Sequence, residues 1–186
     1  MERKPRIDSL RNRELLVGAA KAAFTEAGVA VALEEIARRA GVGIGTLYRN
    51  FPTRDALVAA VYRRELEQLC DAADTLLAER RPDDALETWL HLLLDYMATK
   101  RVVGPVLRAD PGEGTRLYES SGAALTGALD RLVRAAREAG RIRADIGEGD
   151  IFRLLVGMSH GYETPGWENS ARRLVGVVMA GLRSVG

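Results

Sequence analysis

The side chains able to catalyse a reaction or bind a metal ion are few and scattered along this chain of 186 residues. Of the two histidines, His91 and His160, only His160 has a second metal ligand at helical spacing, in Glu163 three residues later. A solvent-facing His160 is the simpler alternative. The single cysteine, Cys70, has no activating group nearby in the sequence and suits a small apolar role. We therefore expect no catalytic site, no metal and no cofactor.

Composition and charge favour a helical protein that carries a basic N-terminal part. Aromatic residues make up only 5% of the chain, while Ala and Leu are abundant. No apolar run approaches the ~20 residues that span a bilayer, and the charged start resembles no signal peptide, so we expect a cytoplasmic protein. Residues 1–54 contain ten Lys or Arg and six Asp or Glu, against 17 and 20 in the remainder. This asymmetry fits a part that meets phosphates, and equally a chance scatter of solvated charges.

Residues 33–52 have the pattern of two short helices joined by a glycine turn. The apolar residues of the first helix recur at i, i+3, i+4 and i+7, as Leu33, Ile36, Ala37 and Ala40. Gly41 follows, where a helix end favours a residue that tolerates the left-handed conformation. A second helix is predicted from about Ile44, and Pro52 stops it after Phe51. Helix, tight turn and helix together predict a helix-turn-helix motif.

This segment resembles the DNA-binding signature of the tetracycline-repressor (TetR) family of transcriptional regulators. The residues that carry the resemblance are, in order, Ile36-Ala37, Ala40-Gly41-Val42, Gly45-Thr46-Leu47-Tyr48 and Phe51. It implies a basic flexible arm at residues 1–8 and a three-helix DNA-binding domain at residues 9–55. A larger effector-binding and dimerisation domain at residues 56–186 would complete an all-α fold of about nine helices.

The resemblance also implies which residues contact DNA. The expected set is Arg38, Ile44, Gly45, Thr46, Tyr48, Arg49, Asn50 and Arg54. We expect Arg49 to read a base directly, because Arg pairs bidentately with O6 and N7 of guanine. For Arg11 and Arg13, near the start of the first helix, a phosphate contact and a plain solvated position both remain open.

Two positions depart from the family pattern. Ala32 and Gly43 stand where a Ser or Thr usually caps each helix of the motif, and a missing cap typically costs ~1 kcal/mol. The basic start of the chain, with Arg3, Lys4 and Arg6, is either a loose end or an arm for the adjacent minor groove.

The rest of the chain predicts long amphipathic helices, with a break at residues 81–83, a short helical turn and loop at residues 102–111, and another break at residues 164–166. Large aromatic side chains, three of them with a polar tip, suggest an effector pocket, formed by Trp89, Tyr96, Tyr118 and Phe152. For each of them, a place in the core is equally compatible with the sequence. The last helix is apolar over more than one face, which favours burial against a second subunit. The expected dimer contacts are Leu155, Met158, Leu174, Val178 and Leu182.

By resemblance, the function expected is that of a homodimeric repressor, which a small molecule releases from a palindromic operator in double-stranded DNA. The alternative is a helical ligand-binding or adaptor protein without specific DNA binding, which the missing hydroxyls at Ala32 and Gly43 keep open. The effector, the operator and the choice between repression and activation are not encoded in any recognisable pattern.

Overall fold

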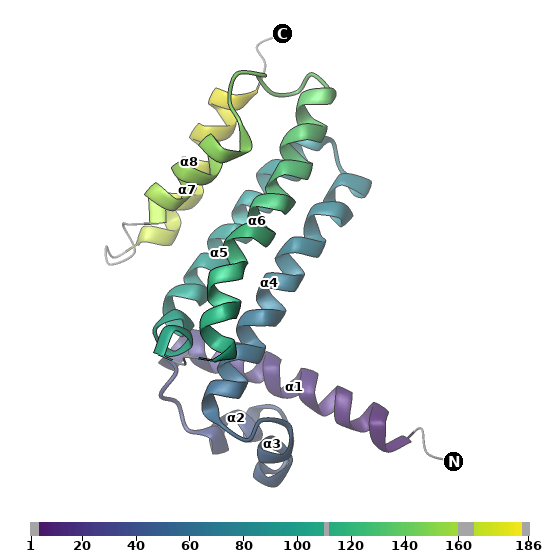
Figure 1. Cartoon of the computed structure of the whole chain (residues 1–186), viewed down its shortest axis with the longest axis vertical. Helices are drawn as coiled ribbons and strands as arrows, with labels where there is room; N and C mark the ends of the chain where they lie inside the picture. Colours follow the sequence, from purple (N-terminus) through teal and green to yellow (C-terminus); the bar gives the residue numbers. More distant parts are fainter. Residues whose placement is uncertain (1–3, 110–111, 160–165, 184–186) are drawn as a thin grey trace. The chain divides into compact units, whose positions relative to one another are not determined.

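The chain forms eight α-helices over residues 4–109, 112–159 and 166–183, which are the residues that the computed structural model describes. The helices are α1 (Lys4–Ala27), α2 (Leu33–Arg39), α3 (Ile44–Asn50), α4 (Arg54–Glu79), α5 (Pro82–Ala109), α6 (Glu113–Glu138), α7 (Glu148–Ser159) and α8 (Trp167–Leu182) (Figure 1). Within these ranges the only β-type pairing is an isolated bridge between Ile142 and Arg183. The prediction of an all-α fold is confirmed.

The chain divides into two compact units. The N-terminal unit comprises Met1–Glu65 and Thr99–Glu119, and the C-terminal unit comprises Leu66–Ala98 and Ser120–Gly186. The division falls inside α4, α5 and α6, so each of these helices contributes residues to both units.

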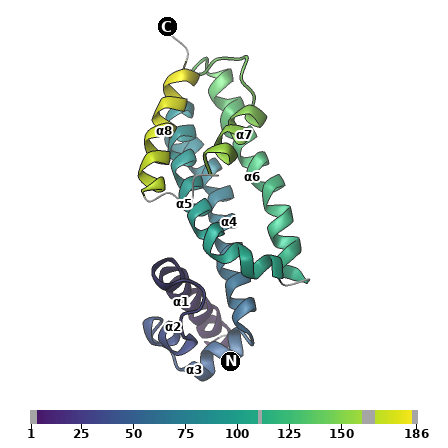
Figure 2. The ribbon, with the colours of Figure 1, turned by 90° about the vertical axis from the view of Figure 1, so that its left-hand side faces the viewer.

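The core of the N-terminal unit forms where α1, α2 and α3 pack together (Figure 2). Its fully or almost fully buried side chains include Leu16, Phe24, Ile36, Leu47, Phe51, Leu57 and Tyr62. The apolar face predicted for the first helix of the motif, with Leu33, Ile36, Ala37 and Ala40, is therefore confirmed as core. Burying a Leu, Ile or Phe side chain stabilises a fold by ~1.5–3 kcal/mol, so these few residues suffice to hold three short helices.

The C-terminal unit has its own core. Its buried apolar residues include Leu86, Trp89, Leu90, Leu93, Leu129, Leu132, Leu155, Val175 and Met179. The indole N–H of Trp89 donates to the backbone oxygen of Leu69 at 2.7 Å, so this buried polar group is satisfied inside the unit. The end of α8 is tied to the loop after α6, since the Arg143 N–H donates to the oxygen of Leu182 at 2.8 Å.

Two helix boundaries differ from those predicted. Helix α1 begins at Lys4, inside the arm predicted at residues 1–8, and Pro5 falls in the first turn of the helix, where no N–H is required of it. Helix α5 continues to Ala109 through Pro105, although Gly104 and Pro105 predicted a break. Interior proline costs a helix ~3 kcal/mol, and here burial of Val103 and Leu107 on either side offsets that cost. The short turn predicted at residues 102–111 is thus part of α5 as far as Ala109, which explains eight described helices instead of about nine.

Candidate nucleic-acid interface

The turn between α2 and α3 closes with a complete Schellman hydrogen-bond pattern. Gly41 has a φ of +69°, the left-handed conformation that its position predicts. Its N–H donates to the oxygen of Arg38 at 3.1 Å, and the N–H of Val42 donates to the oxygen of Ala37 at 3.0 Å. These bonds satisfy the last carbonyls of α2 and fix the angle at which the chain enters α3.

Helix α3 has one buried and one exposed side. Leu47 is fully buried, and Phe51, which follows the helix, is almost fully buried. On the other side, Ile44 and Tyr48 are 36% and 48% exposed and lie one turn apart. Gly43, Gly45 and Arg49 are exposed as well. A short helix that presents a guanidinium, a phenol and two backbone glycines to solvent fits the element that enters a major groove.

Polar side chains on α3 are held close to the helix itself. The Arg49 guanidinium donates to the Thr46 hydroxyl at 2.9 Å, which aligns Arg49 along the exposed side. The Asn50 amide donates to the backbone oxygen of Thr46 at 2.8 Å. Asn50 is therefore turned back towards the helix. Arg49 remains exposed, and it can contact a base by giving up its hydrogen bond to the Thr46 hydroxyl.

Arg13 lies against the C-terminal end of α3. Its guanidinium carbon is 4.4 Å from the centre of the Phe51 ring, and its Nη1 donates to the backbone oxygen of Asn50 at 3.2 Å. A cation at this helix end also complements the helix dipole. Of the two roles left open for Arg13, a plain solvated position does not describe this geometry, and a phosphate contact stays untested. The spacing offered a clue, because Arg13 falls on the same helical stripe as Leu16 and Ala20.

Arg54, at the start of α4, supports the loop between α1 and α2. Its Nη1 donates to the backbone oxygens of Val29 and Val31, both at 2.6 Å. In the family pattern this residue was expected near the DNA backbone. The structure engages its guanidinium with two carbonyl groups of the loop, and its contact with DNA stays a prediction.

Glu35 organises the two arginines of α2. It accepts hydrogen bonds from Arg38 at 2.7 and 2.8 Å and from Arg39 at 2.7 Å, and Arg39 also donates to Glu26 at 2.7 Å. The hydrogen bonds from Arg38 and Arg39 lower the pKa of Glu35 from 4.5 to about 2. Arg38 is the more exposed of the two guanidinium groups, at 73% against 31%, so it is the one available to a phosphate.

Neither α2 nor α3 has a side-chain cap at its start, as the sequence predicts. Ala32 and Gly43 precede α2 and α3 in extended conformations, and neither helix start receives a side-chain hydrogen bond. The next helix differs, because the Thr53 hydroxyl accepts a hydrogen bond from the N–H of Ala56 at 3.1 Å and so caps its start.

The four residues predicted to form an effector pocket have different surroundings. Trp89 and Tyr96 are buried, and Phe152 is half-buried, all in the C-terminal unit. Because Trp89 is fully buried with its N–H satisfied, it is a core residue, which was the alternative that the sequence left open. Tyr118 belongs to the N-terminal unit and is half-buried.

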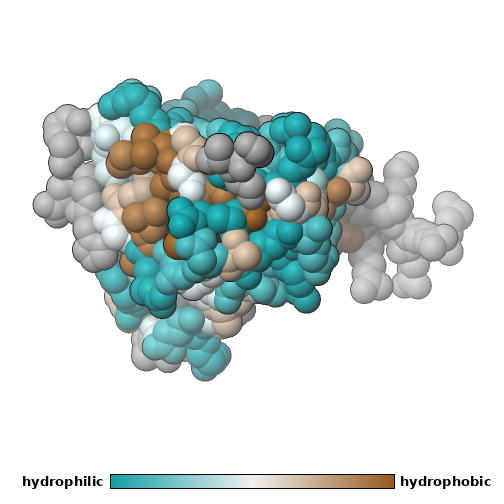
Figure 3. Space-filling model, turned by 90° about the horizontal axis from the view of Figure 1, so that it is seen from above, coloured by the Kyte–Doolittle hydropathy of each residue, from teal (hydrophilic) through white to brown (hydrophobic). Residues whose placement is uncertain are grey.

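An apolar groove of about 650 Å³ lies between α7 and α8. Its lining includes Met158, Leu174, Val178 and Leu182, four of the five predicted dimer contacts. Leu154 and Val177, which the sequence reading did not select, line it as well and are 48% and 66% exposed. Leu155 is fully buried and packs inside the unit. Figure 3 shows brown, apolar surface gathered on the side where α7 and α8 lie in Figure 1.

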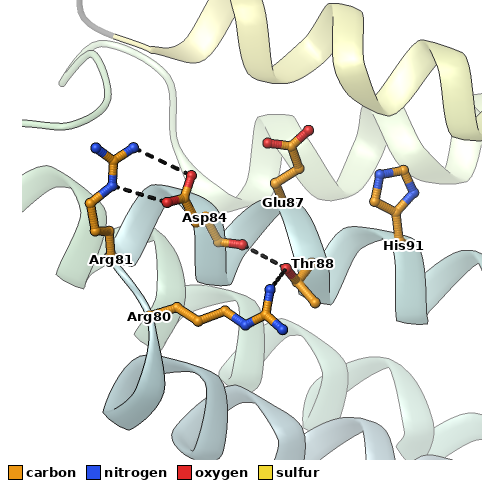
Figure 4. A pocket seen from close by; sticks show the side chains of 6 residues that line it. All are labelled: Arg80, Arg81, Asp84, Glu87, Thr88 and His91. Atoms are coloured by element: carbon orange, nitrogen blue, oxygen red, sulfur yellow. Dashed lines mark hydrogen bonds and ion pairs between the residues drawn. The ribbon is translucent and has the colours of Figure 1, made fainter.

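A second pocket, of about 480 Å³, is polar and lies where α4 ends and α5 begins (Figure 4). Arg81 donates to the Asp84 carboxylate at 2.9 Å, and Arg80 donates to the Thr88 hydroxyl at 3.2 Å. Arg183, at the end of α8, pairs with Asp83, Asp84 and Glu87. The hydrogen bond from Arg81 lowers the pKa of Asp84. His91 lines this pocket too, but the charges around it are matched in pairs, which is the arrangement of a structural network.

His160 and Glu163, whose spacing alone would allow a metal contact, lie outside the described residues. Among the residues that the structure does describe, no group of three or more His, Cys, Asp or Glu could hold a metal ion. Nor is any helix of the described part long and apolar enough to cross a membrane.

Comparisons with known proteins agree with this geometry. The family model for bacterial regulatory proteins of the tetR family matches residues 16–61, and that for the C-terminal domain of SbtR-like transcriptional regulators matches residues 81–184. The crystal structure of the TetR transcriptional regulator SCO0520 from Streptomyces coelicolor has 42% identity and a TM-score of 0.83, covering 94% of this chain and 99% of that one.

Two further relatives point the same way. A TetR transcription regulatory protein from Mycobacterium vanbaalenii has 35% identity and a TM-score of 0.79, over 96% of this chain and 99% of its own. The HTH-type transcriptional repressor Rv1474c of Mycobacterium tuberculosis is 28% identical over 154 residues, which is 78% of this chain and 76% of the relative.

The fold and the exposed side of α3 define a helix-turn-helix DNA-binding protein. The chain belongs to the TetR family of transcriptional regulators. It is a DNA-binding regulator, and the alternative of a helical adaptor without DNA activity is not favoured.

Proposed function

We propose that the protein is a homodimeric repressor that binds a palindromic operator and leaves it when a small molecule binds. The observation that carries the DNA-binding part is the exposed side of α3, with Ile44, Gly45, Tyr48 and Arg49 all accessible. Residues 9–55 form the DNA-binding domain in this proposal, and residues 56–186 bind the effector and the second subunit. The name of the Mycobacterium tuberculosis relative supports repression over activation.

Each subunit places α3 in a major groove, with the two recognition helices separated by one helical turn of DNA, ~34–36 Å. Arg49 reads a base edge, while Thr46, Tyr48 and Arg38 contact phosphates or bases beside it. Because no side chain caps α2 or α3, the anchoring depends more on Arg49 and Arg38 than it does in relatives with hydroxyl caps. Like other regulators of chromosomal DNA, the protein acts in the cytoplasm and needs no catalytic residue.

The groove between α7 and α8 receives the same two helices of a second copy. Its exposed Leu154, Leu174 and Val177 are too apolar for a surface left to solvent. A pairing about a two-fold axis would bury them against their own symmetry mates, as isologous dimers do.

Effector binding shifts the population between a DNA-competent and a released state. A difference of only ~1–3 kcal/mol in effector affinity between these states changes operator affinity several-fold or more. Helix α4 is the natural relay, because it begins four residues after α3 ends and extends into the C-terminal unit.

A gel shift with the DNA upstream of the protein's own gene tests the central proposal. We expect a specific complex that competitor DNA of unrelated sequence does not displace. The affinity should fall steeply as salt is raised, because bound phosphates release condensed counterions. Affinity that is equal for unrelated DNA, or indifferent to salt, would contradict operator binding.

A further inference from the structure

Three glycines alternate along the chain from the end of α2 into α3, at Gly41, Gly43 and Gly45. Gly41 has the positive φ that its turn requires. Gly43, in contrast, has a φ of −70° and a ψ of 149°, which any residue adopts, and Gly45 lies inside α3 without a positive φ. A Cβ atom at either position would have open space around it, with no packed atom within 4 Å. Within the described part of the chain, neither backbone conformation nor packing demands glycine at these two positions.

Gly45 is unfavourable for α3 itself. Glycine loses more conformational freedom on folding than any other residue, so alanine is preferred to it inside a helix. Helix α3 has only seven residues and no side-chain cap, and yet it contains glycine where alanine would fit without strain. This points to a reason outside the chain. One recurring use of glycine is to let another molecule come close to the backbone.

Ile44 stands between these two glycines and faces solvent. It is 36% exposed, and Tyr48, one turn later, is 48% exposed. In α2, α3 and the turn between them, all of which the structure describes, these are the exposed large hydrophobic side chains. Thr46 carries a further methyl group, but it is half-buried, and its hydroxyl is bonded to Arg49. The first turn of α3 therefore presents one branched aliphatic side chain flanked by two positions without side chains.

An exposed aliphatic side chain on a helix that enters the major groove has a complementary group on DNA. Thymine presents its 5-methyl group there, whereas the other features of the base edges are hydrogen-bond donors and acceptors. We propose that Ile44 reads the 5-methyl group of a thymine in each operator half-site, and that Gly45 leaves the space in which this base pair approaches α3. The inference rests on the proposed operator binding and adds an A·T pair to the guanine expected for Arg49.

Gly45 also affects the depth at which Arg49 meets the bases. The two residues are four apart and therefore lie on the same side of α3. The Arg49 side chain is directed back towards the start of the helix, since its guanidinium donates to the Thr46 hydroxyl at 2.9 Å. A methyl group at position 45 would project from this same side. It would keep the first turn of α3 further from the floor of the groove, and with it the Arg49 guanidinium.

Deoxyuridine substitution tests the methyl contact from the DNA side. Deoxyuridine pairs with adenine as thymidine does and lacks only the 5-methyl group. Each thymine of the footprinted operator, in the DNA upstream of the protein's own gene, is replaced in turn, and gel shifts with the full-length protein measure the affinity. One thymine of each half-site should show a loss of about fourfold, the effect of burying one methyl group. The Ile44→Ala protein should show no loss at that position.

Gly45→Ala tests the space beside Ile44. Its melting temperature should equal or exceed that of the wild type, while its specific affinity should fall by about tenfold, as for a mismatched base pair. Affinity for unrelated DNA depends on phosphate contacts and should not change. Gly127→Ala, at an α6 glycine whose Cβ position is equally open, should keep operator affinity. Leu92→Ala removes an exposed aliphatic side chain from α5 and should retain the full deoxyuridine effect.

The outcomes separate this inference from the proposed repression. A wild-type protein without specific operator binding refutes both. Specific binding in which no thymine responds to deoxyuridine overturns the thymine contact and leaves the repression standing. A deoxyuridine effect that persists in full in Ile44→Ala does the same, because another side chain then reads the methyl group. If Gly45→Ala keeps the operator affinity of the wild type, close approach at Gly45 is refuted.

Discussion

The guanidinium of Arg13 lies over the ring of Phe51, with 4.4 Å between the guanidinium carbon and the ring centre. Phe51 follows the recognition helix directly, and Arg13 also donates to the backbone oxygen of Asn50, the last residue of that helix. Through these two contacts α1 determines where the end of α3 lies. Arg13 thus has a structural role. A count of basic residues in the DNA-binding domain would instead suggest that it binds phosphate.

Arg13→Met should lower operator affinity by about tenfold through loss of the cation–π contact and the hydrogen bond to Asn50. Because the Arg13 guanidinium is engaged by Phe51 and Asn50, we expect it to bind no phosphate, so the slope of log affinity against log salt should stay that of the wild type. Arg11→Met, which removes an exposed cation from the same helix, is the comparison. A slope reduced by about one would instead identify Arg13 as a phosphate ligand.

Arg49→Ala should weaken specific binding by ~1–3 kcal/mol and relax the preference at one base pair of each half-site, because its guanidinium is the exposed bidentate donor of α3. Binding to a library of operator variants measures this preference. Arg11→Ala, an exposed arginine on α1, serves as the comparison. An unchanged base preference in the Arg49 variant would exclude Arg49 as the reader.

Acid should destabilise α2 through Glu35. Its pKa is lowered from 4.5 to about 2 in the folded protein, so the stabilisation by ionised Glu35 is complete above pH 4.5 and disappears as pH falls towards 2. Glu35→Gln should reduce the loss of thermal stability over this interval, and added salt should reduce the difference between the two proteins, since the pairs are solvent-exposed. If the melting temperatures of wild type and variant fall equally as pH is lowered through this interval, Glu35 does not contribute to the pH dependence of stability.

Val178→Glu should give monomers, because it places a charge in the apolar groove between α7 and α8. Sedimentation equilibrium measures the mass, and a gel shift should show the loss of operator binding that depends on both subunits. Leu92→Glu introduces the same charge at an exposed leucine of α5 outside the groove lining, and should leave the dimer intact. A Val178→Glu protein that still sediments as a dimer would place the interface elsewhere.

The helix-turn-helix could be predicted from sequence because its determinants are local. Leu33, Ile36 and Ala37 lie within one turn and a half of helix, and Gly41 needs only its own backbone conformation to end it. The same holds for the cap at Thr53, whose hydroxyl bonds an N–H three residues away. The break predicted at Gly104 and Pro105 was wrong for the opposite reason. Their local preference is outweighed by burial of Val103 and Leu107, which depends on residues distant in the chain.

By itself, the sequence determined the all-α class, the position of the recognition helix and the exposure of Arg49 and Tyr48, since these depend on periodicity and on turn residues. Only the tertiary structure decided which arginines support the fold. Arg13 bonds a carbonyl 37 residues away, and Arg54 bonds two that are 25 and 23 residues away. It also placed Lys100 and Arg108 beside Tyr118. The sequence specifies the charge of a side chain. Which partner that side chain contacts depends on which helices pack together, and helix packing is a property of the folded chain.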